Sequence, residues 1–384
     1  MDADEWRVII DGRQSGLTRA ALLQNGELLS FYLQASENRL QTGDIFYAEV
    51  TEERLAAAGW FLTLGDGTSA FLPRDKALHP DQMRKRSHLI VQVEKMPGRG
   101  KGAQLTEQIQ IAGQGLVFLP FSHYSAASRA IEEPLRTSLR HSAAAWCVGE
   151  EGVIVRTEAQ LLDEITLQNE FDRLRKRWNT IYERYQKMEK PGLVERPFTF
   201  LTSILNENHW PKSCTVYCGS TCDCESLVTA IRWVREETGD LFEKYGLEKN
   251  YQDALRRMVP LKAGGSLVID SGEALTAIDV NSGTRHIRDD WEARALQINC
   301  EAATEIARQI RLRGIGGMIV IDFLRLAEED DRKKVADALR AGFARDTETV
   351  KFFGFTAMGL YEITRKRQRY SLQDYQRDKE NNTD

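Results

Sequence analysis

Two short apolar runs in the second half of the chain each contain one aspartate. Residues 275–280 read LTAIDV and residues 318–323 read MIVIDF, so that Asp279 and Asp322 stand close to the ends of the runs. Short apolar runs that are rich in β-branched residues and bounded by glycine are typical of strands covered on both faces. We therefore predict two buried strands, each with an aspartate close to its end.

The segment between these runs has the spacing of a helix. Apolar residues recur at helical spacing from Leu296 to Ile310, Asp289 or Asp290 can cap the start, and Gly314 can end the helix. The pattern predicts a strand–helix–strand unit in which a carboxylate leaves each strand.

Two such strands side by side would bring both carboxylates to one edge of a sheet. A buried aspartate is costly unless it is paired or holds a cation, and carboxylate oxygens suit Mg²⁺ or Mn²⁺. Asn281 follows Asp279 by two residues, so it lies on the same face and can add a ligand or a supporting hydrogen bond. The alternative is that each aspartate only caps the next turn. Because the two aspartates stand at either end of one predicted helix, we favour the metal site over two separate turn caps.

The rest of the chain predicts strands, a barrel and a long helix. Residues 6–34 alternate as short strands separated by glycine, and residues 43–78 have the short strands and central aromatics of a five-stranded oligonucleotide-binding barrel. Residues 158–190 have the pattern of an amphipathic helix, whose Arg-Lys run we interpret as a solvated face. A strand at 214–218, with helices beyond, completes the first domain.

Composition indicates a soluble protein of two or three domains. The 384 residues are 42% hydrophobic and 28% charged. Because the net charge is −5, nucleic-acid binding would depend on local basic patches. The start lacks a signal-peptide pattern and no run approaches the length of a membrane span, so a cytoplasmic protein is expected.

Four of the six cysteines, Cys214, Cys218, Cys222 and Cys224, fall within eleven residues, which is a zinc-ligand type of cluster. If residues 214–218 form a strand, however, the first two sulfurs stand about 13 Å apart and cannot share one tetrahedral ion. The spacing therefore argues against a structural zinc ion. Six cysteines in a chain of this length also indicate a reduced compartment rather than a disulfide scaffold.

Several stretches resemble one known family. ALTAIDVNSG, NCEAATEIARQIRLRGIGGMIVIDF and YEITRKRQR are similar to the catalytic core of the ribonuclease E/G family of bacterial endoribonucleases. The resemblance implies that Asp279 and Asp322 hold a catalytic Mg²⁺, or Mn²⁺ in its place, with Asn281 in support. It implies an enzyme of RNA processing or decay that cuts single-stranded RNA, leaves 5′-phosphate and 3′-hydroxyl ends, and prefers RNA with a 5′-monophosphate.

Two other functions remain open. One is a catalytically inactive RNA-binding or regulatory protein, although a pure binder has no need of two costly carboxylates. The other is a DNA nuclease, because a metal site alone does not select the sugar.

The resemblance also implies a fold, an α/β (α+β) chain of several subdomains. Residues 1–36 and 197–260 would form a ribonuclease H-like subdomain. An S1 RNA-binding barrel (37–107) and a 5′-sensor region (108–196) would be inserted into it, and a DNase I-like catalytic subdomain (261–384) would follow.

Within the barrel, the resemblance assigns RNA binding to three residues. Phe61 and Phe71 would stack on bases and Lys101 would hold phosphate, each stacked base being worth about 1–3 kcal/mol. From the residues alone, both phenylalanines would be read as barrel core.

The resemblance assigns the sensing of a 5′-monophosphate to Gly113, Val117, Arg156 and Thr157. The chemistry is suitable because an arginine presents a planar fork to phosphate oxygens, and a threonine hydroxyl and a nearby amide complete the cradle.

The sequence departs from the family in two respects. A CPxC zinc link after the catalytic region is missing, so we expect at most a weak homo-oligomer and not a zinc-linked tetramer. Ala357 stands where the family has an arginine, which removes an RNA contact, although Arg365, Lys366 and Arg367 lie close in sequence.

Overall fold

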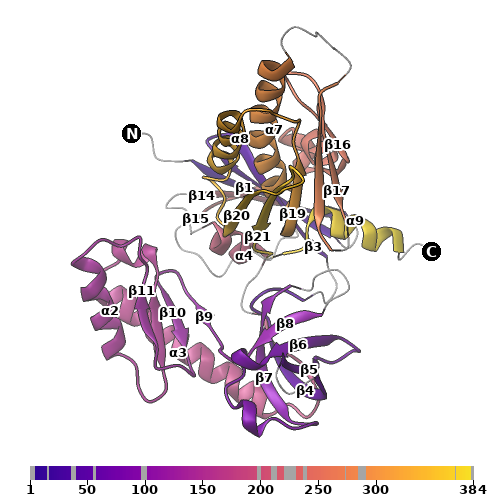
Figure 1. The fold of residues 1–384 in the computed structure, drawn as a ribbon. Helices are drawn as coiled ribbons and strands as arrows, with labels where there is room; N and C mark the ends of the chain where they lie inside the picture. The colour runs from indigo at the N-terminus through magenta and orange to yellow at the C-terminus, as the bar shows by residue number, and fades with distance from the viewer. Residues whose placement is uncertain are drawn as a thin grey trace. The chain divides into compact units, whose positions relative to one another are not determined.

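The computed structural model describes residues 5–14, 17–35, 40–54, 58–96, 102–196, 200–208, 214–219, 231–236, 240–272, 274–283, 291–367 and 369–381. The chain folds as two compact units, Met1–Arg39 together with Pro211–Asp384, and Leu40–Trp210 (Figure 1). Among the described helices, none is both long and apolar enough to span a membrane.

Five strands of the unit Leu40–Trp210 close into a barrel. They are β4 (Ile45–Arg54), β5 (Gly59–Thr63), β6 (Ser69–Pro73), β7 (His88–Lys95) and β8 (Ala103–Thr106). The order β4-β5-β6-β8-β7 closes because β4 also pairs with β7. The 3-10 turns η1 (Arg74–Lys76) and η2 (Pro80–Gln82) join β6 to β7, and β13 (Gly192–Glu195) pairs with β4. The predicted barrel of the oligonucleotide-binding type is confirmed.

The same unit contains a four-stranded sheet in the order β11-β12-β10-β9. Its strands are β9 (Ile111–Ala112), β10 (Leu116–Leu119), β11 (Ser125–Ala127) and β12 (Gly152–Val155). Among the described residues of this unit, the helices are α2 (Leu135–Ala145), α3 (Glu164–Gln186) and α4 (Phe200–Glu207), with the 3-10 turn η3 (Thr157–Leu161) before α3. The apolar stripe of α3 packs on one face of the sheet, where Phe171 meets Phe118 edge to face. The predicted amphipathic helix is confirmed over Glu164–Gln186.

The unit that contains the termini has two sheets. The first has the order β15-β14-β1-β2-β3 and consists of β1 (Trp6–Gln14), β2 (Leu17–Gln24), β3 (Glu27–Ala35), β14 (Cys214–Gly219) and β15 (Ile231–Glu236). The helices α5 (Leu241–Lys244), α6 (Glu248–Leu255) and α9 (Leu372–Asn381) contribute to its core. The buried guanidinium of Arg19 joins strand to helix through Asp11 at 2.7 Å and Glu248 at 2.8 Å. The predicted meander and the strand at 214–218 are confirmed.

The second sheet carries the aspartates. It has the order β16-β17-β18-β19-β21-β20, with β16 (Met258–Pro260), β17 (Ser266–Ser271), β18 (Thr276–Asn281), β19 (Gly317–Asp322), β20 (Val350–Phe355) and β21 (Tyr361–Arg365). The long helix α7 (Trp291–Arg313) joins β18 to its parallel neighbour β19, and α8 (Glu329–Gly342) follows β19. The predicted strand–helix–strand unit is therefore present.

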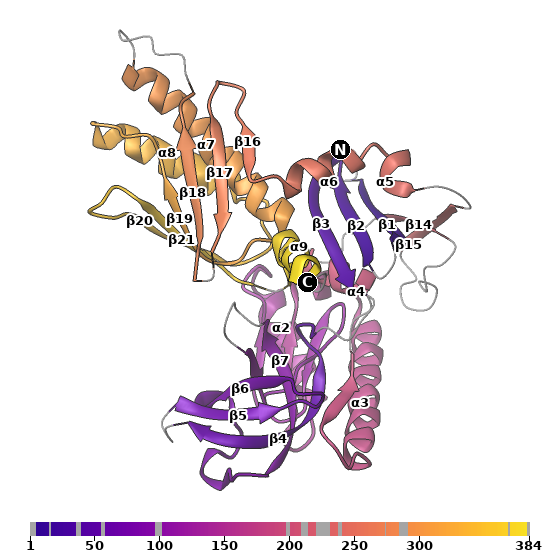
Figure 2. The same cartoon turned by 90° about the vertical axis from the view of Figure 1, so that its right-hand side faces the viewer.

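The prediction that both aspartate strands are covered on two faces is wrong. In β18, Ile278 and Val280 are buried while Ala277, Asp279 and Asn281 are exposed. α7 and α8 contribute to the core on one side of the sheet only (Figure 2). The runs look continuous because some outward positions are also apolar, such as Ala277 in β18 and the exposed Met318 in β19. The carboxylates are thus solvent-accessible, and the cost of burial no longer argues for a cation.

Candidate active site

Asp279 and Asp322 lie side by side on the open face of the second sheet. In the parallel pairing of β18 and β19 they occupy directly matched positions, which places their backbones about 5 Å apart. Both side chains are exposed. The sequence-based prediction that the two carboxylates come together at the ends of neighbouring strands is met by this register.

Asn281 supports the first carboxylate directly. Its side-chain amide donates a hydrogen bond of 2.8 Å to Oδ2 of Asp279, because residues two apart on a strand share a face. The turn before β17 approaches closely, and a Cβ at Gly265 would overlap the carbonyl of Asn281. Gly265 also has φ +86°, so glycine is required there for conformation and for space.

Asn299 of α7 holds the chain just after Asp322. It is fully buried, its amide donates to the carbonyl of Leu324 at 2.8 Å, and its Oδ1 accepts from the Leu324 amide at 3.0 Å. This pair of bonds fixes the backbone two residues beyond the carboxylate. Asn299 is not among the predicted site residues, although a polar residue on the apolar stripe of a predicted helix is a usable signal.

The donor set on this face suits a hard divalent cation. Mg²⁺ keeps several waters and is commonly bound through one or two carboxylates together with substrate phosphate, so two adjacent exposed aspartates are sufficient. In the part of the chain that the structure describes, no group of three or more His, Cys, Asp or Glu residues is arranged to hold a metal ion. Any cation here would therefore be only partly enclosed by protein.

The basic residues 365–367, at the end of β21, lie away from Asp279 and Asp322. Arg365 is buried, bonds Asp346 at 2.8 and 2.9 Å, and donates to the carbonyl of Ile315. It pairs with Gly317 at the far end of β19 from Asp322. Arg365 therefore has a structural role.

Of its neighbours, Arg367 donates to the carbonyl of Gly316 at 2.9 Å and Lys366 is exposed. Ala357 lies in the turn between β20 and β21, and the pairing of Ile321 with Tyr361 brings this turn beside the end of β19.

Phe61 and Phe71 face each other on neighbouring strands of the barrel. They are paired in register, and their ring centroids are 5.3 Å apart. Both alternate with buried residues and are partly exposed, so they lie on the outside of the barrel and not in its core. Their role in RNA binding stays a prediction. Lys101 lies outside the described residues.

The four predicted sensor residues come together around the turn between β9 and β10. Nη1 of Arg156 donates to the carbonyl of Gly113 at 2.8 Å. Thr157 follows Arg156, and its hydroxyl is 2.8 Å from that of Ser128. Val117 is partly exposed and pairs with Ala112 beside the turn. The grouping is consistent with a phosphate cradle, although phosphate binding itself stays a prediction.

Glu170 of α3 holds the turn between β9 and β10 through hydrogen bonds. Its carboxylate accepts the amide of Gln114 and that of Gly115, the latter at 3.1 Å. Burial raises the pKa of the Glu170 carboxyl, and those two amides oppose the shift. A Cβ at Gly113 would overlap the Glu170 carboxylate, so a larger residue there would require this side chain to shift. Glu170 is also absent from the predicted site residues, although its acidic side chain lies on the apolar stripe of α3 and is the same kind of signal.

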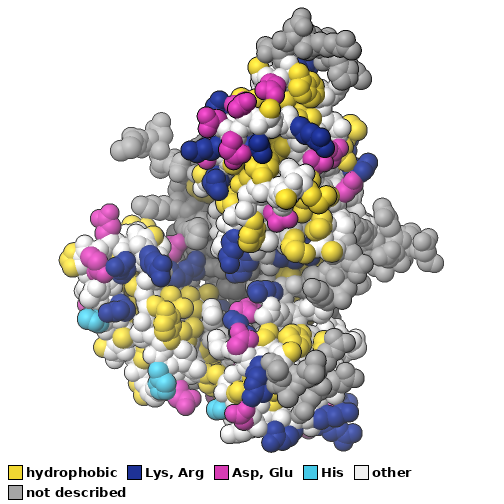
Figure 3. All heavy atoms as spheres, in the orientation of Figure 1, with side chains coloured by type: hydrophobic (Ala, Val, Ile, Leu, Met, Phe, Trp, Pro, Cys, Tyr) yellow, Lys and Arg dark blue, Asp and Glu magenta, His cyan; other side chains and the backbone are white. Residues whose placement is uncertain are grey.

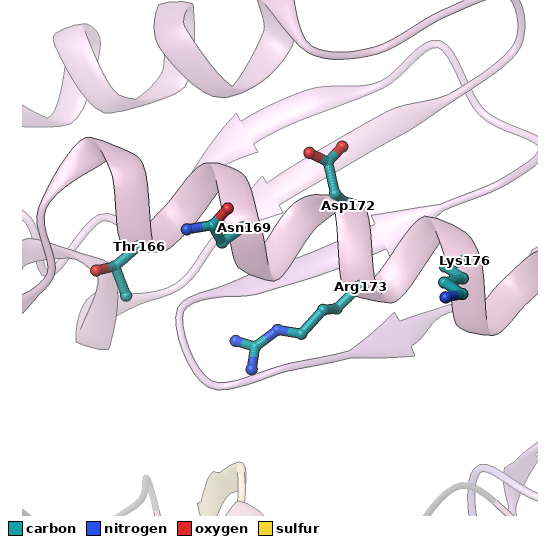
Figure 4. Close-up of a pocket in the computed structure, with 5 residues that line it drawn as sticks. All are labelled: Thr166, Asn169, Asp172, Arg173 and Lys176. Atoms are coloured by element: carbon teal, nitrogen blue, oxygen red, sulfur yellow. The ribbon is translucent and has the colours of Figure 1, made fainter.

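Two surface hollows lie in the unit Leu40–Trp210. One, of about 420 Å³, lies between β11 and the start of α2 and includes Arg129, Arg136 and Arg140 in its lining. The other, of about 530 Å³, is lined by Thr166, Asn169, Asp172, Arg173 and Lys176. Figure 4 shows all five on α3, with the Arg173 side chain extending away from Asp172. Arg173 and Lys176 are exposed, as expected for a solvated face.

Cys214 and Cys218 lie on one continuous strand, β14, and both side chains are buried. Burial raises the pKa of the Cys214 thiol to about 12. The strand does not end between them, which keeps the sulfurs about 13 Å apart. Cys222 and Cys224 lie outside the described residues.

The chain is similar to known proteins along most of its length. A model of the ribonuclease E/G family matches residues 110–368. Ribonuclease G of Salmonella typhimurium (strain SL1344) is 30% identical over 385 residues, which cover 93% of this chain and 79% of that protein. Ribonuclease G of Escherichia coli (strain K12) is 29% identical over the same shares. Ribonuclease E of the same strain is 30% identical over 95% of this chain and 37% of that protein.

Proposed function

Because the chain belongs to the ribonuclease E/G family, we propose that it is an endoribonuclease that cuts single-stranded RNA with the help of a divalent cation. The observation that carries the proposal is the matched register of Asp279 and Asp322 on an open sheet face. An open face admits a polymer at any point along its length, as an endonuclease requires. The proposed products are a 5′-phosphate and a 3′-hydroxyl.

The residues of the site have distinct tasks in this reaction. Asp279 and Asp322 would hold Mg²⁺, which when bound lowers the pKa of water and stabilises charge on the phosphate. Asn281 keeps the Asp279 carboxylate in one orientation through its 2.8 Å hydrogen bond. Water attacks the phosphorus and the bond from phosphorus to the 3′ oxygen breaks, so that this oxygen leaves as a hydroxyl with a proton that the attacking water gives up.

Binding of RNA would use local contacts. On the face drawn in Figure 3, acidic and basic side chains are interspersed with hydrophobic ones and are not separated by sign. The outward pair Phe61 and Phe71 offers a stacking surface on the barrel. The cradle around Arg156 and Thr157 offers donors for a 5′-monophosphate and would favour RNA with that end.

We also propose the family's subdivision of the chain. Residues 1–36 and 197–260 would be the ribonuclease H-like part, 37–107 the S1 barrel, 108–196 the sensor and 261–384 the DNase I-like catalytic part. The closed barrel of β4 to β8 and the separate sheet that carries Asp279 support this assignment.

Incubation of labelled single-stranded RNA with the protein, with and without Mg²⁺, tests the proposed function. Mg²⁺-dependent cleavage to fragments with 5′-phosphate ends is expected, and a chelator should stop it. RNA that is bound but never cut would instead indicate a regulatory RNA-binding protein. Equal cleavage of single-stranded DNA of the same sequence would indicate a general nuclease.

Assembly is expected not to depend on zinc. The buried thiols of Cys214 and Cys218 lie on one strand and cannot share a tetrahedral ion. Light scattering should therefore give a monomer or a weak dimer whose mass is unchanged after zinc is removed. A stable tetramer that contains stoichiometric zinc and dissociates with a zinc chelator would contradict this expectation.

A further inference from the structure

Phe353, at the edge of the catalytic sheet, is a large aromatic side chain exposed to solvent. It lies on β20, the last strand of the sheet, and remains 64% exposed. Its neighbours Phe352 and Phe355 pack against the core beneath the sheet. Phe353 is thus the aromatic residue of this strand that stabilises nothing in the core, and its exposure calls for another explanation.

A bulge places Phe353 on the same side of the sheet as the carboxylates. On β20, Phe352 pairs with the buried Ile363 and therefore lies on the core face of the sheet. Lys351 and Gly354 pair with Thr364 and Glu362, which lie on the opposite, open face. The register shifts between Phe352 and Gly354, so Phe353 is the extra residue and lies with Gly354 opposite Glu362. Bulges re-aim side chains and are frequent beside active sites.

Phe353 is close to the carboxylate pair. β20 is two strands away from β19, and Glu362 pairs with Val320, two residues before Asp322. Strand geometry therefore puts the backbone of Phe353 about 12 Å from that of Asp322. A chain of nucleotides whose phosphate lies at Asp322 would have a neighbouring base within reach of the Phe353 ring.

The charges on this face favour contact through bases. Asp279, Asp322 and Glu362 are all exposed there and repel phosphates wherever no cation lies between. A nucleobase carries no charge and can stack on an aromatic ring regardless of its identity. Lys351 is exposed two residues before Phe353 and can hold the phosphate of the stacked nucleotide.

We propose that Phe353 is a base-stacking platform that positions single-stranded RNA beside the two carboxylates, with Lys351 as its phosphate contact. The inference rests on the proposed function, since the occupant is the RNA substrate. It adds an RNA-positioning residue on β20 to the binding residues proposed on the barrel and in the sensor.

The test measures RNA binding without cleavage. Wild type, Phe353→Ala, Phe353→Leu and Phe353→Trp are titrated in Mg²⁺ with labelled single-stranded RNA whose linkages resist hydrolysis, and Kd is read from anisotropy. Phe353→Ala and Phe353→Leu are expected to raise Kd about five- to 150-fold, the loss of one stacked base. Phe353→Trp should bind as wild type does or more tightly. The thermal midpoint should stay unchanged in all three because the side chain is exposed.

Two controls separate stacking from other effects. Ile165→Ala removes a side chain of similar exposure, 74%, on α3 and should leave Kd unchanged. Lys351→Ala should lower the slope of log K against log salt concentration by about one, whereas Phe353→Ala should leave that slope unchanged.

Three outcomes would overturn the inference. One is unchanged Kd in Phe353→Ala while the wild type binds RNA. Another is equal weakening in the leucine and tryptophan variants. The third is a dimer that Phe353→Ala dissociates in light scattering, which would assign this edge to a second copy of the chain. Failure of the proposed function would look different, since the wild type would then bind RNA without cutting it, or would not bind RNA.

Discussion

Asp279→Asn and Asp322→Asn are each expected to reduce RNA cleavage by about a thousandfold or more, because a bound cation contributes several kcal/mol to catalysis. A carboxamide has nearly the shape of a carboxylate but lacks the charge that holds Mg²⁺. Both side chains are exposed on a sheet whose core lies on the other face, so folding should be unaffected. Initial rates on labelled RNA, together with a thermal melt, check both statements.

Asp270 provides the matched control for these variants. It is an exposed aspartate on β17 whose carboxylate is held by Arg257, at 2.5 Å to Nη2. Asp270→Asn changes the charge of the same face by the same amount and should keep most of the activity. Loss of activity in all three variants would mean that the overall charge of the face matters and not a cation site. Undiminished cleavage in Asp279→Asn or Asp322→Asn would remove that residue from the mechanism.

The positions of the two aspartates could be predicted because they depend on local pattern. Each apolar run is a strand, the helical spacing between them predicts α7, and a strand–helix–strand connection commonly brings its two strands side by side in parallel. The exposure of the strands could not be predicted in the same way. Periodicity reveals a solvated face only when outward positions are polar, and here Ala277 and Met318 hide the alternation.

The contacts that support the site depend on tertiary structure. Asn299 meets Leu324 from 25 residues away, and Glu170 meets Gly115 from 55 residues away. Contacts between residues so far apart in the sequence do not follow from a propensity or a motif. The acidic or amide side chain within an apolar stripe signals a buried partner, because burying such a group without a hydrogen bond costs about 1–3 kcal/mol. The sequence does not say which backbone groups provide that partner.

The sensor residues could be named only through the family resemblance, and a second large effect is expected from them. Arg156→Ala should remove a charge-assisted contact worth about 1.5–3 kcal/mol, a loss of roughly 10- to 150-fold in kcat/KM on RNA with a 5′-monophosphate. On RNA with a 5′-hydroxyl the loss should be small, because that end offers no phosphate. Single-turnover cleavage of the two RNAs, identical except at the 5′ end, measures the difference.

Arg156 also donates to the carbonyl of Gly113, so its removal changes the turn as well as the charge. Thr157→Val keeps that bond and removes only the hydroxyl next to Ser128, and it should weaken cleavage of the monophosphorylated RNA selectively. Arg173→Ala, an exposed arginine on α3, should affect both RNAs equally and weakly. If Arg156→Ala slows both RNAs to the same extent while Thr157→Val slows neither, Arg156 holds the turn and does not read the RNA end.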